Sequence, residues 1–423
     1  MTKKIIMKTV LIALSVAVII LITGIIYFEI EPENTNVSFN PAESQNVTDT
    51  TIRFNSDGKL KILHIADTHL NYDKHFDASV WVIAEACDVE KPDLVVLTGD
   101  NTHPNEDPEK TKNLINALMN IFESRDIPVA VTFGNHDSEA GPMTRKDIMD
   151  YYKTFSCVIT ADESVNFKNC ATFNIPVLAS DSDKVKFNLW VFDSGDYDED
   201  EPRHYDRVRT EQIEWYKETS AKLKKENGGE TVNSVVFQHI IVPEIYNVLK
   251  KVESKQPYAV KRIYNEEEYY IFDPDRINYG TLNEKPCPGY YNDGQFDALV
   301  ENGDVLAMFT GHDHTNAFGV RYQNIDIYTS PMTRYKGLAY TTQYGYRVVE
   351  IDENDTSKYE TRVERLYDVF DFDYIETAKD NGDKYSSRIA FELAVKGKVQ
   401  EIFLKLYQSA IELVTGRQVT YPD

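Results

Sequence analysis

Residues 60–69 read LKILHIADTH, an apolar run of strand length that ends in Asp67, Thr68 and His69. Short runs rich in Val, Ile and Leu are typical of buried β-strands. Four further runs of this kind also end in polar or histidine-bearing blocks, at residues 93–101 (DLVVLTGDN), 127–137 (IPVAVTFGNHD), 234–240 (SVVFQHI) and 305–314 (VLAMFTGHDH). The sequence therefore predicts five strands that each end in chemically active side chains.

Amphipathic helices are predicted between these strands. One begins near Asp77, a second at Asp107 followed by Pro108, and a third at Thr210. Alternating strands and helices form βαβ units with parallel strands. In such sheets, functional groups gather in the crevice outside the carboxyl ends of the strands. We therefore expect an α/β fold in which the five polar blocks meet.

The first two blocks offer carboxylate and imidazole donors. Asp67 and His69 are two residues apart, so in an extended strand end both would point to the same side and could share one metal ion. Asp100 follows a glycine, and its two carboxylate oxygens suit a bridge between two cations. Each block alone is equally compatible with an ordinary turn.

The remaining blocks complete a set of nitrogen and oxygen donors. Asn135 offers an amide oxygen, and His239, His312 and His314 offer imidazoles. His136 would stay free to transfer a proton. A single histidine of this kind is more often a hydrogen-bonded core residue. The ordered set of five blocks favours metal ligation.

The order of the blocks, Asp-x-His, Gly-Asp, Gly-Asn-His-Asp, His and Gly-His-x-His, resembles the calcineurin-like metallophosphoesterase superfamily. Three longer strings, 193–196 (DSGD), 238–244 (QHIIVPE) and 310–316 (TGHDHTN), resemble the branch related to plant purple acid phosphatase 29 and the yeast Dcr2-type phosphatases. The similarity runs from about residue 60 to residue 350.

This resemblance implies a four-layer αββα sandwich with a binuclear metal centre. It implies two ligand sets that share one carboxylate, the first being Asp67, His69, Asp100 and His314, and the second Asp100, Asn135, His239 and His312. It further implies that His136 is the general acid, and Asp137 is the candidate for orienting it. Mixed nitrogen and oxygen ligands suit manganese, iron or zinc, as two divalent or mixed-valence ions.

The sequence departs from the family pattern at His103, three residues after Asp100. In the family pattern, purple acid phosphatases have a metal-bound tyrosine at this position, and the related protein phosphatases have a carboxylate that orients the histidine. The departure predicts that an iron-loaded protein lacks the tyrosinate colour. His103 could contact substrate phosphate or be exposed to solvent, and the sequence favours neither.

The function expected from these residues is hydrolysis of a phosphate monoester by a metal-activated hydroxide. A phosphodiesterase acting on nucleotides or lipid headgroups would share the same residues. A non-catalytic metal-binding surface protein is the alternative of a different class. Substrate choice is expected to depend on the loops at 138–185 and 245–292.

The net charge of −24 restricts the partners. So acidic a surface repels duplex nucleic acid and anionic lipid headgroups, and only a local metal site would attract phosphate. No protein partner follows from the sequence.

Residues 10–28 form an uncharged apolar run preceded by three lysines. Its length and flanks predict a transmembrane helix that anchors the catalytic domain outside the cytoplasm. A cleaved signal peptide followed by secretion is the alternative. The predicted organisation is a cytoplasmic tail (1–9), the anchor (10–28), a polar linker (29–57), the metallophosphoesterase domain (58–370) and a C-terminal helical extension (371–423).

Export would permit disulfide bonds. Cys157 and Cys170 could close a short loop, whereas Cys87 lies on an apolar helical stripe and is expected to be a free buried thiol.

Overall fold

The computed structural model describes residues 51–415, apart from residues 140, 160–166, 254–255, 257, 274, 277, 337–338, 340 and 382. Within this part the chain divides into two compact units, residues 51–364 and residues 365–415. The larger unit contains all five polar blocks.

The five predicted strands are all present. They are β1 (Lys59–Ile65), β2 (Leu94–Thr98), β3 (Val129–Thr132), β7 (Ser234–Gln238) and β12 (Val305–Thr310). The neighbouring strands β1, β2 and β3 are parallel, and so are β7 and β12. Their carboxyl ends therefore share one edge in each sheet.

Two sheets contain these strands. The six-stranded sheet has the order β16-β15-β1-β2-β3-β4, completed by β4 (Val158–Ile159), β15 (Gly345–Asp352) and β16 (Glu360–Arg365). The seven-stranded sheet has the order β11-β13-β14-β12-β7-β6-β5, completed by β5 (Phe173–Leu178), β6 (Val185–Phe192), β11 (Asn278–Thr281), β13 (Ala317–Tyr322) and β14 (Ile325–Thr329).

The two sheets pack face to face because their strands are apolar on both sides. Ile62 of β1 and Leu189 of β6 belong to one fully buried core cluster that joins the sheets. The next residue of β6, Trp190, points the other way and packs with Tyr216 and Phe296. A strand buried on both faces must carry apolar residues at successive positions, as these runs do.

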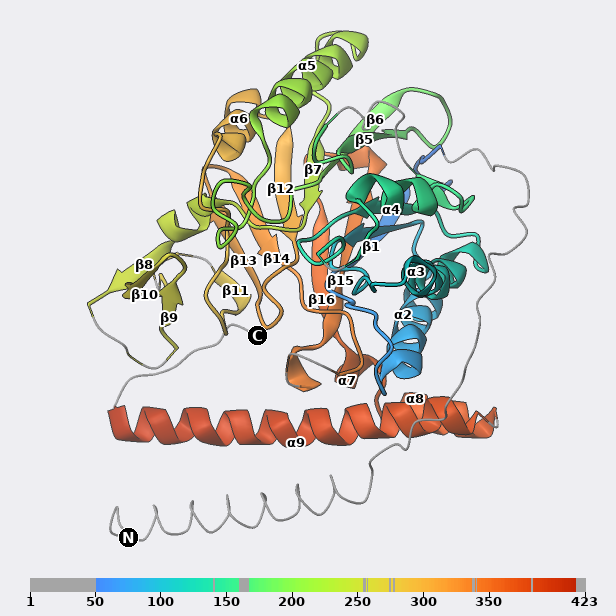
Figure 1. Cartoon of the computed structure of the whole chain (residues 1–423), viewed down its shortest axis with the longest axis vertical. Helices are drawn as coiled ribbons and strands as arrows, with labels where there is room; N and C mark the ends of the chain where they lie inside the picture. Colours follow the sequence, from blue (N-terminus) through green and yellow to red (C-terminus); the bar gives the residue numbers. More distant parts are fainter. Residues whose placement is uncertain are drawn as a thin grey trace, which may run out of the picture. The chain divides into compact units, whose positions relative to one another are not determined.

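Helices cover the outer faces of the paired sheets (Figure 1). They are α2 (Phe76–Glu90), α3 (Pro108–Glu123), α4 (Arg145–Tyr152), α5 (Thr210–Glu226) and α6 (Gln295–Asn302). The predicted start of α3 is confirmed, since the Asp107 side chain accepts a hydrogen bond of 3.1 Å from the Glu109 N–H. The α/β fold with several sheets is therefore confirmed.

The two segments predicted to be loops contain regular structure. Residues 138–185 include α4, β4 and β5. Residues 245–292 include a separate three-stranded antiparallel sheet of β8 (Leu249–Val252), β10 (Asn265–Phe272) and β9 (Val260–Arg262). The description of these segments as loops was wrong.

The smaller unit is helical in the described residues. It contains α7 (Leu366–Val369), α8 (Phe372–Asp380) and α9 (Lys384–Thr415).

The predicted anchor at 10–28 and most of the linker lie outside the described residues. Among the helices of the described part, none combines the length and the apolar composition needed to cross a bilayer. Cys157 and Cys170 are free buried thiols in the structure, as is Cys87, so the suggested disulfide is not formed.

Candidate metal centre

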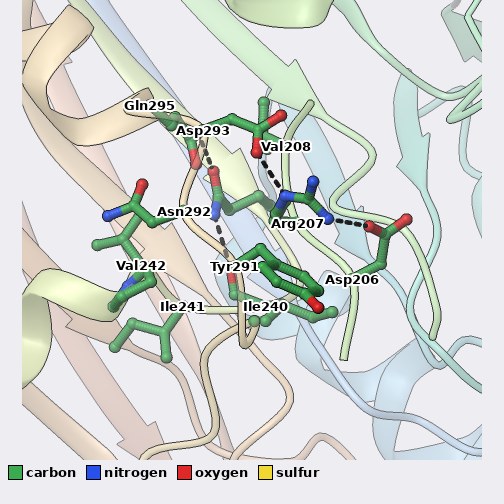
Figure 2. A pocket seen from close by; sticks show the side chains of 13 residues that line it. Asp206, Arg207, Val208, Ile240, Ile241, Val242, Tyr291, Asn292, Asp293 and Gln295 are labelled. Atoms are coloured by element: carbon green, nitrogen blue, oxygen red, sulfur yellow. Dashed lines mark hydrogen bonds and ion pairs between the residues drawn. The ribbon is translucent and has the colours of Figure 1, made fainter. Parts of the chain in front are cut away.

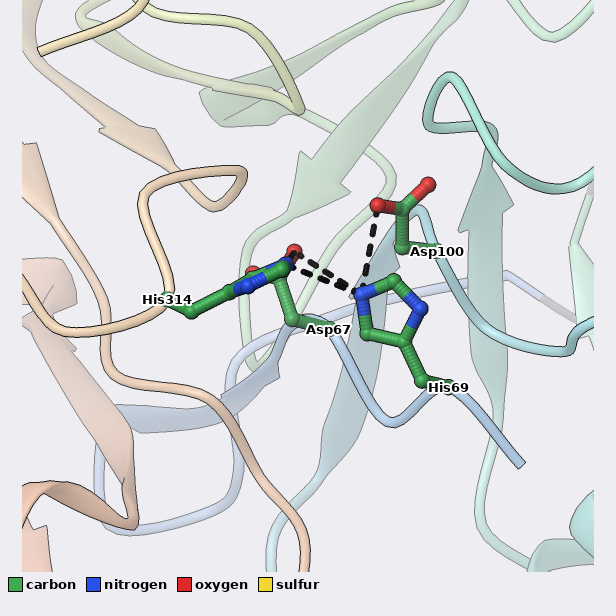
Figure 3. A group of neighbouring side chains, drawn as sticks. All are labelled: Asp67, His69, Asp100 and His314. Atoms are coloured by element: carbon green, nitrogen blue, oxygen red, sulfur yellow. Dashed lines mark hydrogen bonds and ion pairs between the residues drawn. The ribbon is translucent and has the colours of Figure 1, made fainter. Parts of the chain in front are cut away.

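The predicted ligands converge where β1, β2 and β12 end. Figure 3 shows Asp67, His69, Asp100 and His314 pointing toward one another from three separate segments. His69 Nε2 lies 3.4 Å from Asp100 Oδ2, and His314 Nε2 lies 3.7 Å from Asp67 Oδ1. The two imidazole nitrogens, His69 Nε2 and His314 Nε2, are 3.0 Å apart. This grouping is the first predicted ligand set.

A second grouping lies on the other side of Asp100. His239 Nε2 is 3.3 Å from Asp100 Oδ2 and 3.2 Å from His312 Nδ1. Asn135 Oδ1 is 3.3 Å from the same His239 nitrogen. The structure thus brings together all seven residues predicted as ligands, with Asp100 common to both groups.

The ligands are held by an unusual backbone conformation. Asp67, His69, Asp100 and His312 have φ values of 55°, 42°, 50° and 73°, in the left-handed region that non-glycine residues seldom adopt. The convergence of Asp67 and His69 therefore does not come from the period-two geometry of a strand, and that part of the prediction was wrong. Both residues lie in the irregular segment that follows β1.

Gly134 allows the loops after β2 and β3 to approach closely. A Cβ atom at this position would lie 2.2 Å from Asp100 Oδ1 and 2.5 Å from the Asp100 nitrogen. Any larger residue would therefore displace the shared carboxylate. Gly134 is needed for the position of Asp100.

Asp137 does not orient His136, which corrects the role assigned to it from the sequence. Its carboxylate accepts hydrogen bonds from the backbone N–H groups of Gly134 (2.7 Å), Asp100 (2.7 Å) and Asn101 (2.9 Å). Because its oxygens are occupied by these donors, it holds together the loops after β2 and β3.

The ring of His136 contacts Glu139 instead. Glu139 Oε2 and His136 Nδ1 form a short contact, and Glu139 Oε1 accepts a hydrogen bond of 3.1 Å from the Tyr197 hydroxyl. The same hydroxyl lies 3.1 Å from Asn135 Nδ2. Glu139 and Tyr197 were not identified from the sequence, since a glutamate in a turn and a tyrosine outside the five blocks carry no distinctive pattern.

His103 lies within the site. Its ring centroid is 5.5 Å from that of His69 and 5.3 Å from that of His136. The side chain is half-buried, so it is neither fully solvated nor part of the core. No tyrosine or carboxylate takes the corresponding family position.

Two arginines, the buried Arg334 and the partly buried Arg145, also support the site and were not identified from the sequence. Arg334 donates a hydrogen bond of 2.7 Å to the carbonyl of His69. Arg145 donates one of 2.9 Å to the carbonyl of Gly134 and forms an ion pair with Asp193. Both lie outside the five blocks, so only the fold reveals their proximity.

Burial and the shared carboxylate control the charges of the site. Burial lowers the pKa values of His69 and His312 well below the usual range, which keeps these imidazoles in the neutral, metal-binding form. Burial opposes a charge on His239 too, but Asp100 raises the pKa of His239 to about 9. Burial raises the pKa of Asp67 to about 8. Metal binding would therefore release protons from His239 and Asp67.

The donors fit a pair of metal ions. Asp100 Oδ2 is fully buried and makes no hydrogen bond of regular geometry within the described residues, although the imidazole nitrogens of His69 and His239 approach it. A buried carboxylate needs a positive charge nearby, which protonated His239 supplies in the metal-free chain and metal ions would supply in its place. The nitrogens of His69 and His239 face this oxygen from two sides, as a bridging carboxylate requires.

A small cavity lies behind the loop that follows β7 (Figure 2). Its volume of about 20 Å³ is enough for roughly one water molecule. Arg207 forms ion pairs beside it with Asp293 (2.6 Å) and Asp198 (3.0 Å). These ion pairs join the segments around residues 198, 207 and 293, and the cavity has no room for a substrate.

The fold and the site together define a metal-dependent phosphoesterase. Residues 60–316 match the model of the calcineurin-like phosphoesterase family, and the chain belongs to that family, whose members use dinuclear metal centres. The resemblance recognised in the sequence, including its branch, is confirmed.

Several known proteins are similar to this chain. Probable inactive purple acid phosphatase 14 of Arabidopsis thaliana is 28% identical over 309 residues, which cover 65% of this chain and 71% of the relative. Phosphatase DCR2 of Saccharomyces cerevisiae is 25% identical over 292 residues, covering 63% of this chain and 46% of the relative. A dimetal phosphatase from Danio rerio aligns structurally with a TM-score of 0.40 and 12% identity, over 72% of this chain and 98% of that one.

Proposed function

We propose that this protein is a phosphomonoesterase that binds two metal ions through the residues grouped above. Asp67, His69, Asp100 and His314 would hold one ion, and Asp100, Asn135, His239 and His312 the other. The observation that supports this most directly is the buried Oδ2 of Asp100, which imidazole nitrogens of both groups approach at 3.4 Å and 3.3 Å.

When bound, the two ions would supply an activated hydroxide as nucleophile and bind the phosphoryl oxygens. The protein itself supplies the acid. The backbone N–H of His136 donates a hydrogen bond of 2.8 Å to Asp100 Oδ1, which ties the position of His136 to the shared carboxylate. Its side chain is 27% exposed and its ring centroid lies 5.3 Å from that of His69, so it would protonate the leaving-group oxygen of an ester bound at the centre.

Manganese, iron and zinc all suit this donor set. Both ligand groups consist of Asp, Asn and His side chains. We therefore propose a centre without a phenolate ligand, in line with the presence of His103 at the family position.

Two other functions need to be distinguished from this one. A phosphodiesterase would use the same centre. A metal-binding protein without activity is suggested by the names of the Arabidopsis relatives, which are called probable inactive purple acid phosphatases, whereas the yeast relative is called a phosphatase. The complete set of seven donors, with His136 beside them, supports an active centre in this chain.

The test is hydrolysis by the purified full-length chain, loaded in turn with manganese, iron and zinc. We expect faster hydrolysis of p-nitrophenyl phosphate than of bis-p-nitrophenyl phosphate. A preference for the diester would favour the phosphodiesterase. Full occupancy by two metal ions without hydrolysis of either compound would favour the non-catalytic protein.

A further inference from the structure

His136 lacks the partner that the family motif would supply. His103 occupies the position of the orienting carboxylate, and the oxygens of Asp137 are occupied by backbone donors. The ring nevertheless has a carboxylate partner, because the N–H of Glu139 donates a hydrogen bond of 3.3 Å to the carbonyl of His136. This turn places the Glu139 side chain against Nδ1 of the ring.

The same carboxylate also determines the direction of two further hydrogen bonds. An ionised carboxylate only accepts, so the Tyr197 hydroxyl must donate its proton to Glu139 Oε1, at 3.1 Å. The hydroxyl oxygen can then only accept from Asn135, and the group that donates must be the amide nitrogen, at 3.1 Å.

The orientation of the Asn135 amide follows from this. With its nitrogen turned toward Tyr197, its Oδ1 faces His239 Nε2 at 3.3 Å, on the side of the second ligand group. The amide oxygen is the only side-chain atom of Asn135 that can bind a metal ion. One carboxylate thus controls both the ring of the acid and the amide of a ligand.

We propose that Glu139 and Tyr197 form a positioning relay that holds the His136 ring and the Asn135 amide in their working orientations. This inference rests on the proposed function, in which His136 is the acid and Asn135 a ligand. Neither relay residue touches the reacting atoms, so both act through the groups that they orient.

The location of the relay separates it from the core. The side chains of His136 and Glu139 are 27% and 40% exposed, so their contact lies at the rim of the site. Because little apolar surface depends on it, replacing Glu139 or the Tyr197 hydroxyl should leave the fold intact. Effects on orientation can then be measured without loss of structure.

The first experiment concerns the acid. Glu139→Gln retains the size of the side chain, but an amide has one oxygen and cannot accept from both partners. We expect turnover of phenyl phosphate to fall by about 10- to 100-fold, less than loss of the acid itself, and that of 2,4-dinitrophenyl phosphate to change little. In a His136→Ala background the same change should have less than about a twofold further effect, since coupled groups are not additive. Glu218→Gln, on the exposed face of α5, is the matched control.

The second experiment concerns the ligand and does not require activity. Tyr197→Phe removes one hydroxyl and frees the Asn135 amide to rotate. We expect manganese to bind the second position about tenfold more weakly, as measured by calorimetric titration of the metal-free protein. This is the smallest loss of affinity usually seen when a residue that holds a metal ligand is removed. Tyr279→Phe, at an exposed tyrosine, is the matched control.

The relay would be overturned by an equal loss for both leaving groups in Glu139→Gln, or by an undiminished loss in the His136→Ala background. Unchanged manganese affinity in Tyr197→Phe would overturn the claim that the relay orients the Asn135 amide. If the wild type hydrolyses neither ester, the proposed function fails, and the manganese titration alone decides whether the relay orients Asn135.

Discussion

Asp100→Asn is the substitution that tests the metal centre most severely. Asp100 Oδ2 lies 3.4 Å from His69 Nε2 and 3.3 Å from His239 Nε2, and it is the only carboxylate oxygen that faces both ligand groups among the described residues. Asparagine has almost the same shape, and its oxygen can still accept the hydrogen bond from the His136 N–H. The loop should therefore keep its conformation while the shared negative charge is lost.

The size of the effect follows from burial. Removing one partner of a buried charge pair costs about 3–5 kcal/mol. Applied to each metal position, this corresponds to roughly a 10²- to 10⁴-fold loss of affinity at both sites. Turnover should fall by several orders of magnitude, because hydrolysis needs both ions.

Metal content by mass spectrometry, manganese affinity by calorimetry and turnover of p-nitrophenyl phosphate should be measured together. Asp181→Asn, in the exposed turn between β5 and β6, is the control for loss of a carboxylate elsewhere. Two fully occupied positions and near-normal turnover in Asp100→Asn would refute the assignment of Asp100 as the shared ligand. Loss of only one metal ion would show that the ligand set of the retained ion does not need Asp100.

Three further predictions concern the acid, His103 and the anchor. His136→Ala should retain both metal ions but lower turnover by roughly 10²- to 10⁴-fold, with a smaller loss for esters with good leaving groups; a uniform loss in a leaving-group series would remove His136 from the role of acid. The iron-loaded wild type should lack a visible tyrosinate band, and His103→Tyr should create one because residue 103 lies beside His69; a purple wild type would require another tyrosine on the metal. Protease added to intact cells should release a soluble catalytic fragment by cutting within residues 31–58, since polar linkers are preferred cleavage sites; protection until the cells are lysed would contradict the outward orientation.

The sequence predicted the parts of the site that depend on strand ends. Five apolar runs are easily recognised, and parallel strands bring their carboxyl ends together, so the convergence of Asp67, Asp100 and His312 follows from a pattern. The contact between His136 and Glu139 could not be predicted in this way. It depends on a tight turn that brings the third residue after His136 to the ring and turns the adjacent Asp137 inward to backbone donors.

The sheet of β8, β9 and β10 was missed for a different reason. Residues 265–272 read NEEEYYIF, which shows neither a continuous apolar run nor a regular alternation. Most side chains of β10 are exposed or partly exposed, so the strand does not need the apolar composition by which a buried strand is recognised. Strands of this kind are identified by their pairing partners, which a single sequence does not reveal.

The left-handed backbone conformation at Asp67, His69, Asp100 and His312 positions metal ligands but lowers the stability of the fold. This conformation costs on the order of 1 kcal/mol or more for each residue with a side chain, and glycine adopts it without that cost. Replacing any of the four by glycine would therefore relieve conformational strain in the metal-free chain while removing a donor. A variant that no longer needs catalytic activity could gain heat resistance by such changes. In the active enzyme, bound metal ions and hydrogen bonds such as those of Asp137 must offset the conformational strain. The thermal stability of this protein is thus expected to depend strongly on its metal content.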